Sequence, residues 1–229
     1  MRTATVILAA VVAASSPSWV RAQAPRPDFS GYWELRVDSF HVPRAALTAQ
    51  AAGRLDEQAA RDADALARCV PIGMPAVMDD RAPIDVRHAP TVMGIVAPSP
   101  SSTRHIYTDG RPHPDEDELE GTTNGHSSGR WEGDVLVVDT VGFSERGVTR
   151  VPGGGFRTPR SRLVERYRLL ENGRRLSVVF TWTDPGVFQA PHTYEFRYYR
   201  AARPREPRLT NCIPDQERTR FLTGRPEAK

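Results

Sequence analysis

Lysine is almost absent from this sequence of 229 residues, because Lys229 is the single lysine among 31 basic residues. Enzymes that need an internal lysine, such as pyridoxal phosphate enzymes and proteins with a phosphate-binding loop, are therefore excluded. The chain has no C-x-x-C, H-x-H or H-E-x-x-H spacing and no dinucleotide-binding fingerprint. We therefore predict no cofactor and no metal, although the acidic loop of residues 113–126 leaves metal binding open.

Long hydrophobic runs are absent as well. The apolar stretch of residues 6–14 is too short to cross a bilayer. It follows Arg2 and precedes Val20, Arg21 and Ala22. Val20 and Ala22 place small or short side chains at the two sites that a signal peptidase inspects. We expect residues 1–22 to be a signal peptide and residues 23–229 to form one exported domain, periplasmic or secreted, without membrane insertion.

Cysteine is scarce, since Cys69 and Cys212 are the only two. In an exported chain two cysteines usually form one disulfide, with a pair of buried free thiols as the alternative. The formal net charge is +3, and the arginines are scattered among acidic residues instead of forming a basic stripe. The sequence thus predicts no nucleic-acid partner and leaves the oligomeric state open.

The hydrophobic pattern predicts a mainly β fold. Alternation marks strands at residues 29–37, 129–143 and 192–200, and two more flank Asn172 and Gly173, a type I′ hairpin signal. With a two-residue turn there, two residues lie opposite each other when their numbers sum to 345, as Glu165 and Phe180 do. One helix is predicted at about 44–68, with an apolar face of Leu47, Ala51, Leu55, Ala59, Ala63 and Leu66. We predict a closed or nearly closed antiparallel barrel of seven or eight strands; a sandwich is the alternative.

Two acidic residues fall among apolar neighbours in these strands. Asp139 shares its predicted face with Trp131 and Val137, and Glu165 lies opposite Phe180. A carboxylate in such surroundings must be paired or have a raised pKa. It either forms a buried ion pair with one of the many arginines or belongs to a polar site inside an apolar cup, as in small-molecule sites.

His126 precedes the strand of residues 129–143, and a histidine at a strand end can transfer protons near neutral pH. A loop histidine that only makes a hydrogen bond is the alternative. Residues 125–129 (GHSSG) match the G-x-S-x-G nucleophile elbow. The flanking segments are an acidic loop and a strand, whereas the elbow needs a strand and a helix, so a serine nucleophile is not favoured.

Three segments resemble a family of exported bacterial proteins: IYTDGRPHP at 106–114, GHSSGRWEGD at 125–134 and LVVDTVGF at 136–143. The likeness continues through residues 164–167 and 181–185 and spans roughly residues 104–200. It implies a β-rich, barrel-like domain and no particular reaction. Residues 31–33 (GYW) are similar to the G-x-W opening of lipocalins, so we expect a lipocalin-like (calycin-like) antiparallel barrel with one helix in its N-terminal half.

Three functions are compatible with these residues. The first is a cofactor-independent acid–base enzyme, a lyase, isomerase or hydrolase, acting on a small cyclic or sugar-like molecule in the barrel cavity. The second is a periplasmic barrel that binds a small molecule without catalysis, and the third is a structural protein whose acids pair with arginine. We expect the first, with catalytic residues His126, Asp139, Glu165 and Tyr107, and with Asp109, Arg111, His113, Trp131 and Trp182 in contact with the substrate.

Overall fold

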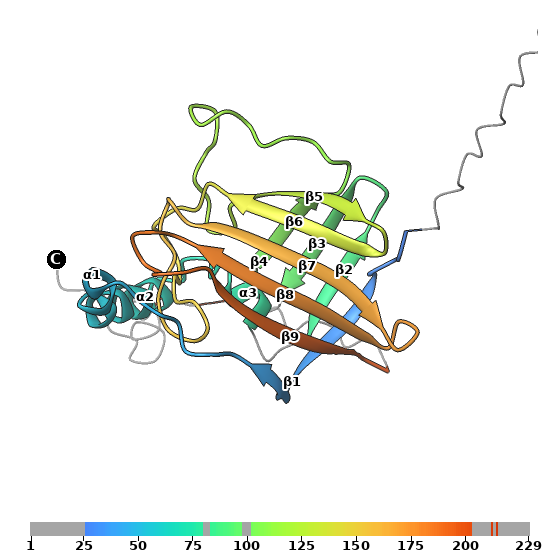
Figure 1. Ribbon diagram of the computed structural model, residues 1–229, viewed down its shortest axis with the longest axis horizontal. Coiled ribbons are helices and arrows are strands. Elements are labelled where there is room, and N and C mark those ends of the chain that lie inside the picture. The colour runs from blue at the N-terminus through green and yellow to red at the C-terminus, as the bar shows by residue number, and fades with distance from the viewer. Residues whose placement is uncertain (1–25, 80–82, 98–101, 203–211, 213, 215–229) are drawn as a thin grey trace, which may run out of the picture.

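The computed structural model describes residues 26–79, 83–97, 102–202, 212 and 214. Nine strands form a closed barrel in which each strand pairs with the next in sequence and β9 pairs with β1 (Figure 1). The predicted barrel is confirmed, with nine strands instead of the seven or eight expected. Its strands are β1 (Gly31–His41), β2 (Ile84–His88), β3 (Val92–Ala97), β4 (Ser102–Tyr107), β5 (His126–Glu132), β6 (Val135–Val141), β7 (Arg162–Leu170), β8 (Arg175–Thr183) and β9 (His192–Arg200). The predicted signal peptide lies outside the described residues.

One strand pair departs from the predicted antiparallel arrangement. β4 and β5 run parallel, with Ile106 beside Ser127, while the other neighbouring strands are antiparallel. Parallel neighbours need a long crossover connection, which here is the loop of residues 108–125. This loop rises above β5 in Figure 1. The barrel is therefore mixed, and the crossover brings a polar segment back to the start of β5.

The hairpin of β7 and β8 has the predicted register. Glu165 lies opposite Phe180, and Leu163 opposite Trp182. The turn itself differs from the prediction, because Leu170 and Arg175 are the last pair and a four-residue loop joins them. Residues 171–173 all have positive φ, so the left-handed segment extends beyond the two expected turn residues.

The segment of residues 129–143, predicted as one strand, is a second hairpin. β5 ends at Glu132 and β6 begins at Val135, and Gly133 has φ +63° in the turn between them. Trp131 pairs with Leu136 across the turn. The reversal changes the inward face from odd-numbered to even-numbered residues. Asp139 therefore points outward instead of sharing a face with Trp131.

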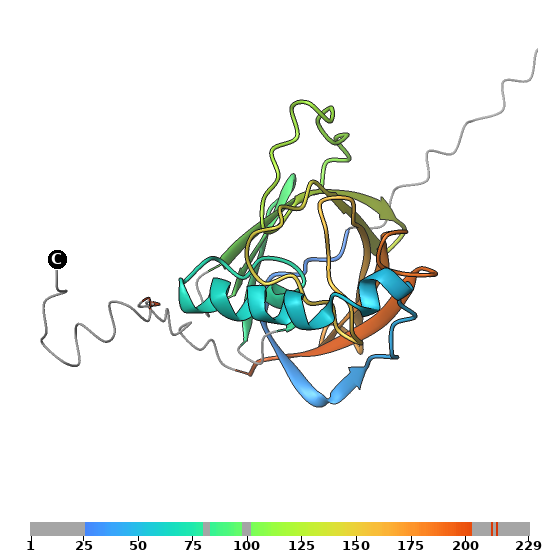
Figure 2. The ribbon, with the colours of Figure 1, turned by 90° about the vertical axis from the view of Figure 1, so that its left-hand side faces the viewer.

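The predicted helix is divided into α1 (Ala49–Ala52) and α2 (Leu55–Ala67), which lie across one end of the barrel (Figure 2). The predicted apolar face is wrong in part, because Leu55 and Leu66 are 37% and 47% exposed. Asp62 is buried instead and accepts hydrogen bonds from the backbone N–H groups of Thr149 and Arg150. Polar anchoring to a loop thus adds to the packing of Ala51 and Ala65, which are buried at 1% and 5% exposure. No helix in the described part of the chain is long and apolar enough to span a membrane.

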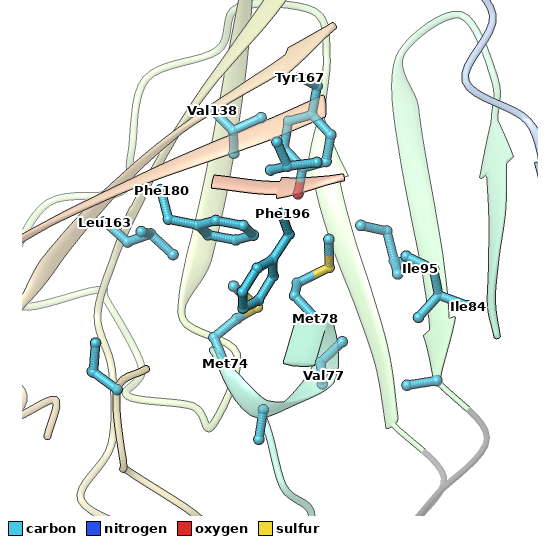
Figure 3. Packing of buried hydrophobic residues seen from close by; sticks show 14 of the residues in the cluster. Met74, Val77, Met78, Ile84, Ile95, Val138, Leu163, Tyr167, Phe180 and Phe196 are labelled. Carbon is cyan, nitrogen blue, oxygen red and sulfur yellow. The ribbon is translucent and has the colours of Figure 1, made fainter. Parts of the chain in front are cut away.

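A short segment enters the barrel and packs among the inward side chains. Met74, Val77 and Met78, in or next to α3 (Ala76–Asp79), are fully buried, and Figure 3 shows Met74 and Met78 near Phe196. The Tyr198 hydroxyl donates a hydrogen bond to the Met78 carbonyl oxygen at 2.6 Å. This segment therefore occupies part of the space in which we expect a lipocalin-like barrel to hold a ligand.

The predicted disulfide between Cys69 and Cys212 is confirmed, with a Cα–Cα distance of 5.6 Å. It joins the end of α2 to a residue beyond β9, 143 positions later in the sequence. The disulfide therefore joins the segment that precedes β2 to the segment that follows β9.

Candidate functional site

Side chains from the three motif segments meet on the outer face of the barrel. Nδ1 of His113, in the crossover loop, lies 2.8 Å from Nδ1 of His126 at the start of β5. Nε2 of His113 lies 3.5 Å from Oδ2 of Asp139 on β6. The ring of Tyr107, at the end of β4, lies 5.4 Å from the His126 ring. We call these four residues, with Arg162 of β7, the outer cluster.

The strand alternation shows that this cluster faces outward. Ser127 and Thr140 neighbour His126 and Asp139 in sequence, and both are buried at 1% and 0% exposure. His126 and Asp139 are only partly buried. Because successive residues of a strand point to opposite faces, the buried neighbours point inward and the cluster points outward.

Backbone geometry sets the position of His126. Gly125 has φ +68°, and a Cβ atom at this position would lie 2.7 Å from the Val141 carbonyl oxygen. Only glycine satisfies both conditions without strain. The Ser128 hydroxyl donates a hydrogen bond to the Arg111 carbonyl oxygen and holds the crossover loop against β5. The loop histidine and the strand histidine are thus held together from both sides.

The contact between the two Nδ1 atoms fixes a proton arrangement. At 2.8 Å one nitrogen must donate and the other accept, so a single proton lies between them. Nε2 of His113 makes no hydrogen bond within the described residues, and Oδ2 of Asp139 lies 3.5 Å from it. The negative charge of Asp139 favours a proton on this nitrogen, and we assign the His113 proton there. Nδ1 of His113 then accepts from Nδ1 of His126, and Nε2 of His126 carries a free lone pair.

Charges around the cluster keep Asp139 ionised. Arg162 donates from Nε to Oδ1 at 2.8 Å and from Nη2 to Oδ2 at 2.6 Å. Burial acts to raise the pKa of Asp139, but the hydrogen bonds and charge of Arg162, together with His113, hold the pKa below its ordinary value. Burial, followed by the charges of His113 and Arg111, lowers the pKa of His126. A neutral His126 that is linked through His113 to an ionised Asp139 is the state expected of a general base.

Asp109 and Arg111 flank the outer cluster. The Arg111 guanidinium lies 4.1 Å from the centre of the Tyr107 ring, which is a cation–π contact. Asp109 accepts from Arg111 at both carboxylate oxygens, and hydrogen bonding to Arg111 lowers the pKa of Asp109 to about 2. These two predicted substrate contacts are therefore engaged with each other and with Tyr107.

Glu165, the second predicted acid, lies inside the barrel and apart from the outer cluster. It forms an ion pair with Arg104, and both side chains have 0% exposure. The Tyr167 hydroxyl donates to Oε1 of Glu165 at 2.8 Å, and Nη2 of Arg104 donates to the Thr140 hydroxyl at 3.0 Å. Burial acts to lower the pKa of Arg104, but the charges and hydrogen bonds of Glu165 and Tyr167 together outweigh it and raise the pKa. We call Arg104 and Glu165 the inner pair. Tyr167, Thr140 and Ser127 are its hydrogen-bond partners.

Neither predicted tryptophan contact belongs to the outer cluster. Trp182 is fully buried and donates to the Tyr194 hydroxyl at 3.1 Å. Trp131 stacks on Phe29 with ring centres 5.8 Å apart and packs against the core. The structure thus brings together Tyr107, His113, His126 and Asp139 of the predicted set, with Asp109 and Arg111 beside them.

The other motifs have clear places. Ser127 is buried with the inner pair, and it lies on a strand that is not followed by a helix, so the arrangement of a nucleophile elbow is absent at this serine. Within the described ranges, no group of three or more His, Cys, Asp or Glu side chains is arranged to hold a metal ion.

Sequence reasoning missed three residues near these sites. Arg162 and Arg104 could not be assigned as partners because the pairing of β4, β6 and β7 is set by tertiary structure. His105 could have been found, since it stands two residues before Tyr107, and residues two apart in a strand share a face.

Comparison with known proteins supplies no relative: no protein-family model matches the chain, and no curated protein matches it.

Proposed function

We propose that this protein is an exported, cofactor-independent enzyme that transfers protons on a small molecule at the outer cluster. The observation that carries the proposal is the chain of contacts from Asp139 through His113 to His126. It has the order acid, orienting histidine, reacting histidine, in which the Asp139 charge favours a proton on Nε2 of His113 and Nδ1 of His113 accepts the proton of His126. The proposal moves the reaction from the expected barrel cavity to the outer face.

The steps follow from the proton arrangement. Nε2 of His126 takes a proton from a C–H or O–H group of the substrate. The imidazolium that forms keeps its Nδ1 proton in the hydrogen bond to His113, and the Asp139 carboxylate offsets the positive charge through His113. The same Nε2 proton then returns to another atom of the substrate, which is an isomerisation, or to a leaving group, which is an elimination by a lyase. The Tyr107 hydroxyl is a donor for the substrate oxygen.

The geometry favours an enzyme over a purely structural role for this cluster. An ion pair between Asp139 and Arg162 alone would suffice to hold β6 against β7, and it does not need two histidines. In the part of the chain that the structure describes, no group hydrogen-bonds Nε2 of His126. A histidine nitrogen with a free lone pair, on a ring that is linked through a second histidine to a carboxylate, is suited to acid–base catalysis.

A binding protein without catalysis is the second candidate. It is favoured by a groove on the outer face of β2 to β4 that borders Tyr107. Such a protein would bind its ligand equally well with and without His126. Export is part of both candidates and rests on the predicted signal peptide together with the disulfide.

Deuterium exchange tests the catalytic proposal without knowledge of the substrate. The protein is incubated in D₂O with cyclic ketones, 2-oxo acids and ketoses, and loss of C–H signals is followed by proton NMR. We expect accelerated exchange for at least one compound, a loss of about 100-fold or more in His126→Ala, and a smaller loss in Asp139→Asn. Asp134→Asn is the matched control and should exchange as the wild type does. Asp134 is an exposed acid in the β5–β6 hairpin that also carries Asp139, and it is paired with Arg168 of β7. Exchange that is equally fast in His126→Ala would contradict the proposal.

A further inference from the structure

A groove of about 530 Å³ lies on the outer face of the barrel beside the outer cluster. It runs over β2, β3 and β4. Its lining residues are Ser30, Arg87, His88, Ala89, Val92, Gly94, His105 and Tyr107. This lining contains an arginine, two histidines and a tyrosine but no carboxylate.

Gly94 forms the floor of the groove. It pairs with Arg87 on one side and with His105 on the other, so the three residues form one row across the sheet. With strands spaced about 4.8 Å apart, the Cα atoms of Arg87 and His105 are roughly 10 Å apart. A Cβ atom at Gly94 would meet only the Arg87 carbonyl oxygen, at 3.9 Å. The space above the glycine is therefore open and bounded on both sides by nitrogen-bearing side chains.

The donors that border this space have capacity left. Nε and Nη2 of Arg87 both donate to Oδ2 of Asp85, at 3.0 and 2.8 Å. Among the hydrogen bonds of the described residues, none uses Nη1 of Arg87 or the side chain of His105. Hydrogen bonding to Asp85 raises the pKa of Arg87, so its guanidinium stays charged. Nη2 of Arg87 also donates to the Tyr32 hydroxyl at 3.1 Å, so the two N–H groups of Nη1 are the ones left to donate to a carboxylate.

The groove is continuous with the proposed catalytic residues. Tyr107 lines the groove, and its ring is 5.4 Å from the His126 ring. The parallel register that sets Ile106 beside Ser127 places His105 beside His126, one residue earlier on each strand. A molecule seated on Gly94 of β3 is therefore separated from the reacting histidine of β5 by a single strand, β4.

We propose that this groove binds a small, flat organic carboxylate, and that such acids are the substrate class of the outer cluster. The carboxylate contacts Arg87 and His105, the flat body covers Gly94, and the remainder of the molecule points along Tyr107 toward His126. The assignment as substrate rests on the proposed function, whereas the binding site itself does not.

Binding measurements with matched probes test the site. Benzoate and cyclohex-1-ene-carboxylate are titrated in parallel with their neutral amides and followed by ligand-detected NMR. We expect each acid to bind the wild type at least about tenfold more tightly than its amide, because only the acid can pair with the guanidinium. Acids that bind no more tightly than their amides would overturn the proposal.

Filling the groove supplies the second arm of the test. Gly94→Val should weaken binding of both acids by at least about tenfold, and Gly94→Ala, which adds a single methyl group, should weaken it less. Neither residue needs a strained backbone here, and valine suits a strand, so both variants should fold. Thr103→Val, on the same face of β4 but outside the lining, is the control and should bind as the wild type does. Unchanged binding by Gly94→Val would contradict the site.

The outcomes separate this inference from the proposed function. Asp134→Asn should bind the acids as the wild type does, because Asp134 lies outside both the groove lining and the outer cluster. Carboxylate binding without any proton exchange would support the groove and remove the catalytic proposal. Proton exchange without preferential carboxylate binding would remove the groove and leave the catalytic proposal standing.

Discussion

Asp139 and Glu165 are carboxylates on neighbouring strands, and each is paired with an arginine, yet the two pairs lie in opposite surroundings. Glu165 and Arg104 lie inside the barrel with 0% exposure. Asp139 and Arg162 lie outside, where the arginine is 59% exposed. The same pair of residue types is therefore a structural element on one face of the sheet and part of an accessible site on the other. Direction of the side chain, and not residue type, decides the role.

The inner pair should dominate stability. We expect Glu165→Gln to lower the free energy of unfolding by about 3–5 kcal/mol, because it leaves Arg104 charged and unpaired in a dry interior. Asp139→Asn should cost at most about 1 kcal/mol, since its partner is exposed to solvent. Urea unfolding of both variants measures the difference. Similar losses in the two variants would remove the contrast between the faces.

A double replacement sharpens the same comparison. Arg104→Met with Glu165→Leu removes both buried charges and fills their volume with apolar groups. We expect it to lose much less stability than Glu165→Gln alone, because a buried ion pair recovers little more than its desolvation cost. A double variant as unstable as the single one would show that the pair stabilises the barrel through its other hydrogen bonds.

The backbone beneath the outer cluster should show the next largest effect. Gly125→Ala places a Cβ atom 2.7 Å from the Val141 carbonyl oxygen, at φ +68°. We expect a loss of about 1–3 kcal/mol and disruption of the His113–His126 contact. Gly133→Ala is the matched control, since Gly133 has φ +63° but nothing within 4 Å of its added Cβ. Equal losses would mean that the left-handed backbone, and not the close approach, is the constraint.

Removal of His113 should alter titration more than stability. In His113→Ala we expect the pKa of His126 to rise toward the ordinary value, because the burial that mainly lowers it decreases when the neighbouring ring is removed. Unfolding free energy should change by less than about 1 kcal/mol, as the loop histidine is partly exposed. A ¹H NMR titration of the His126 ring protons gives the pKa. An unchanged value would show that His113 does not control His126.

The smallest expected effect is the pH dependence of stability near neutrality. The pKa of His126 is lowered in the folded protein from 6.5, so the unfolded chain binds more protons just below that value. The contribution of neutral His126 to the free energy of unfolding is complete above pH 6.5 and is lost as the pH falls through the lowered pKa of the folded protein. Unfolding measured at pH 7.5 and 5.5 should show a smaller decrease for His126→Ala than for the wild type. A decrease of the same size in both proteins would assign the effect to other groups.

Local pattern predicted much of the fold and part of the site. The register of β7 and β8 was predictable because two independent alternations agree with one turn position. The hairpin at Gly133 was missed, although glycine followed by Asp134 is a turn signal, because apolar residues continue on both sides of it. That single error assigned the wrong side of the barrel to Asp139. The buried Asp62 and the parallel β4–β5 pair depend on tertiary contacts that no local period encodes.

The tautomers of the two outer histidines test the central claim most directly. Long-range ¹H–¹⁵N correlation spectra of the ¹⁵N-labelled protein at pH 7.5 identify which ring nitrogen of each histidine carries a proton. The account predicts the Nε2–H form for His113, the Nδ1–H form for His126, and a pKa of His126 below 6.5. A neutral His126 protonated at Nε2 and lacking a free lone pair there, or a pKa above 6.5, would contradict the assignment of His126 as the proton-accepting group.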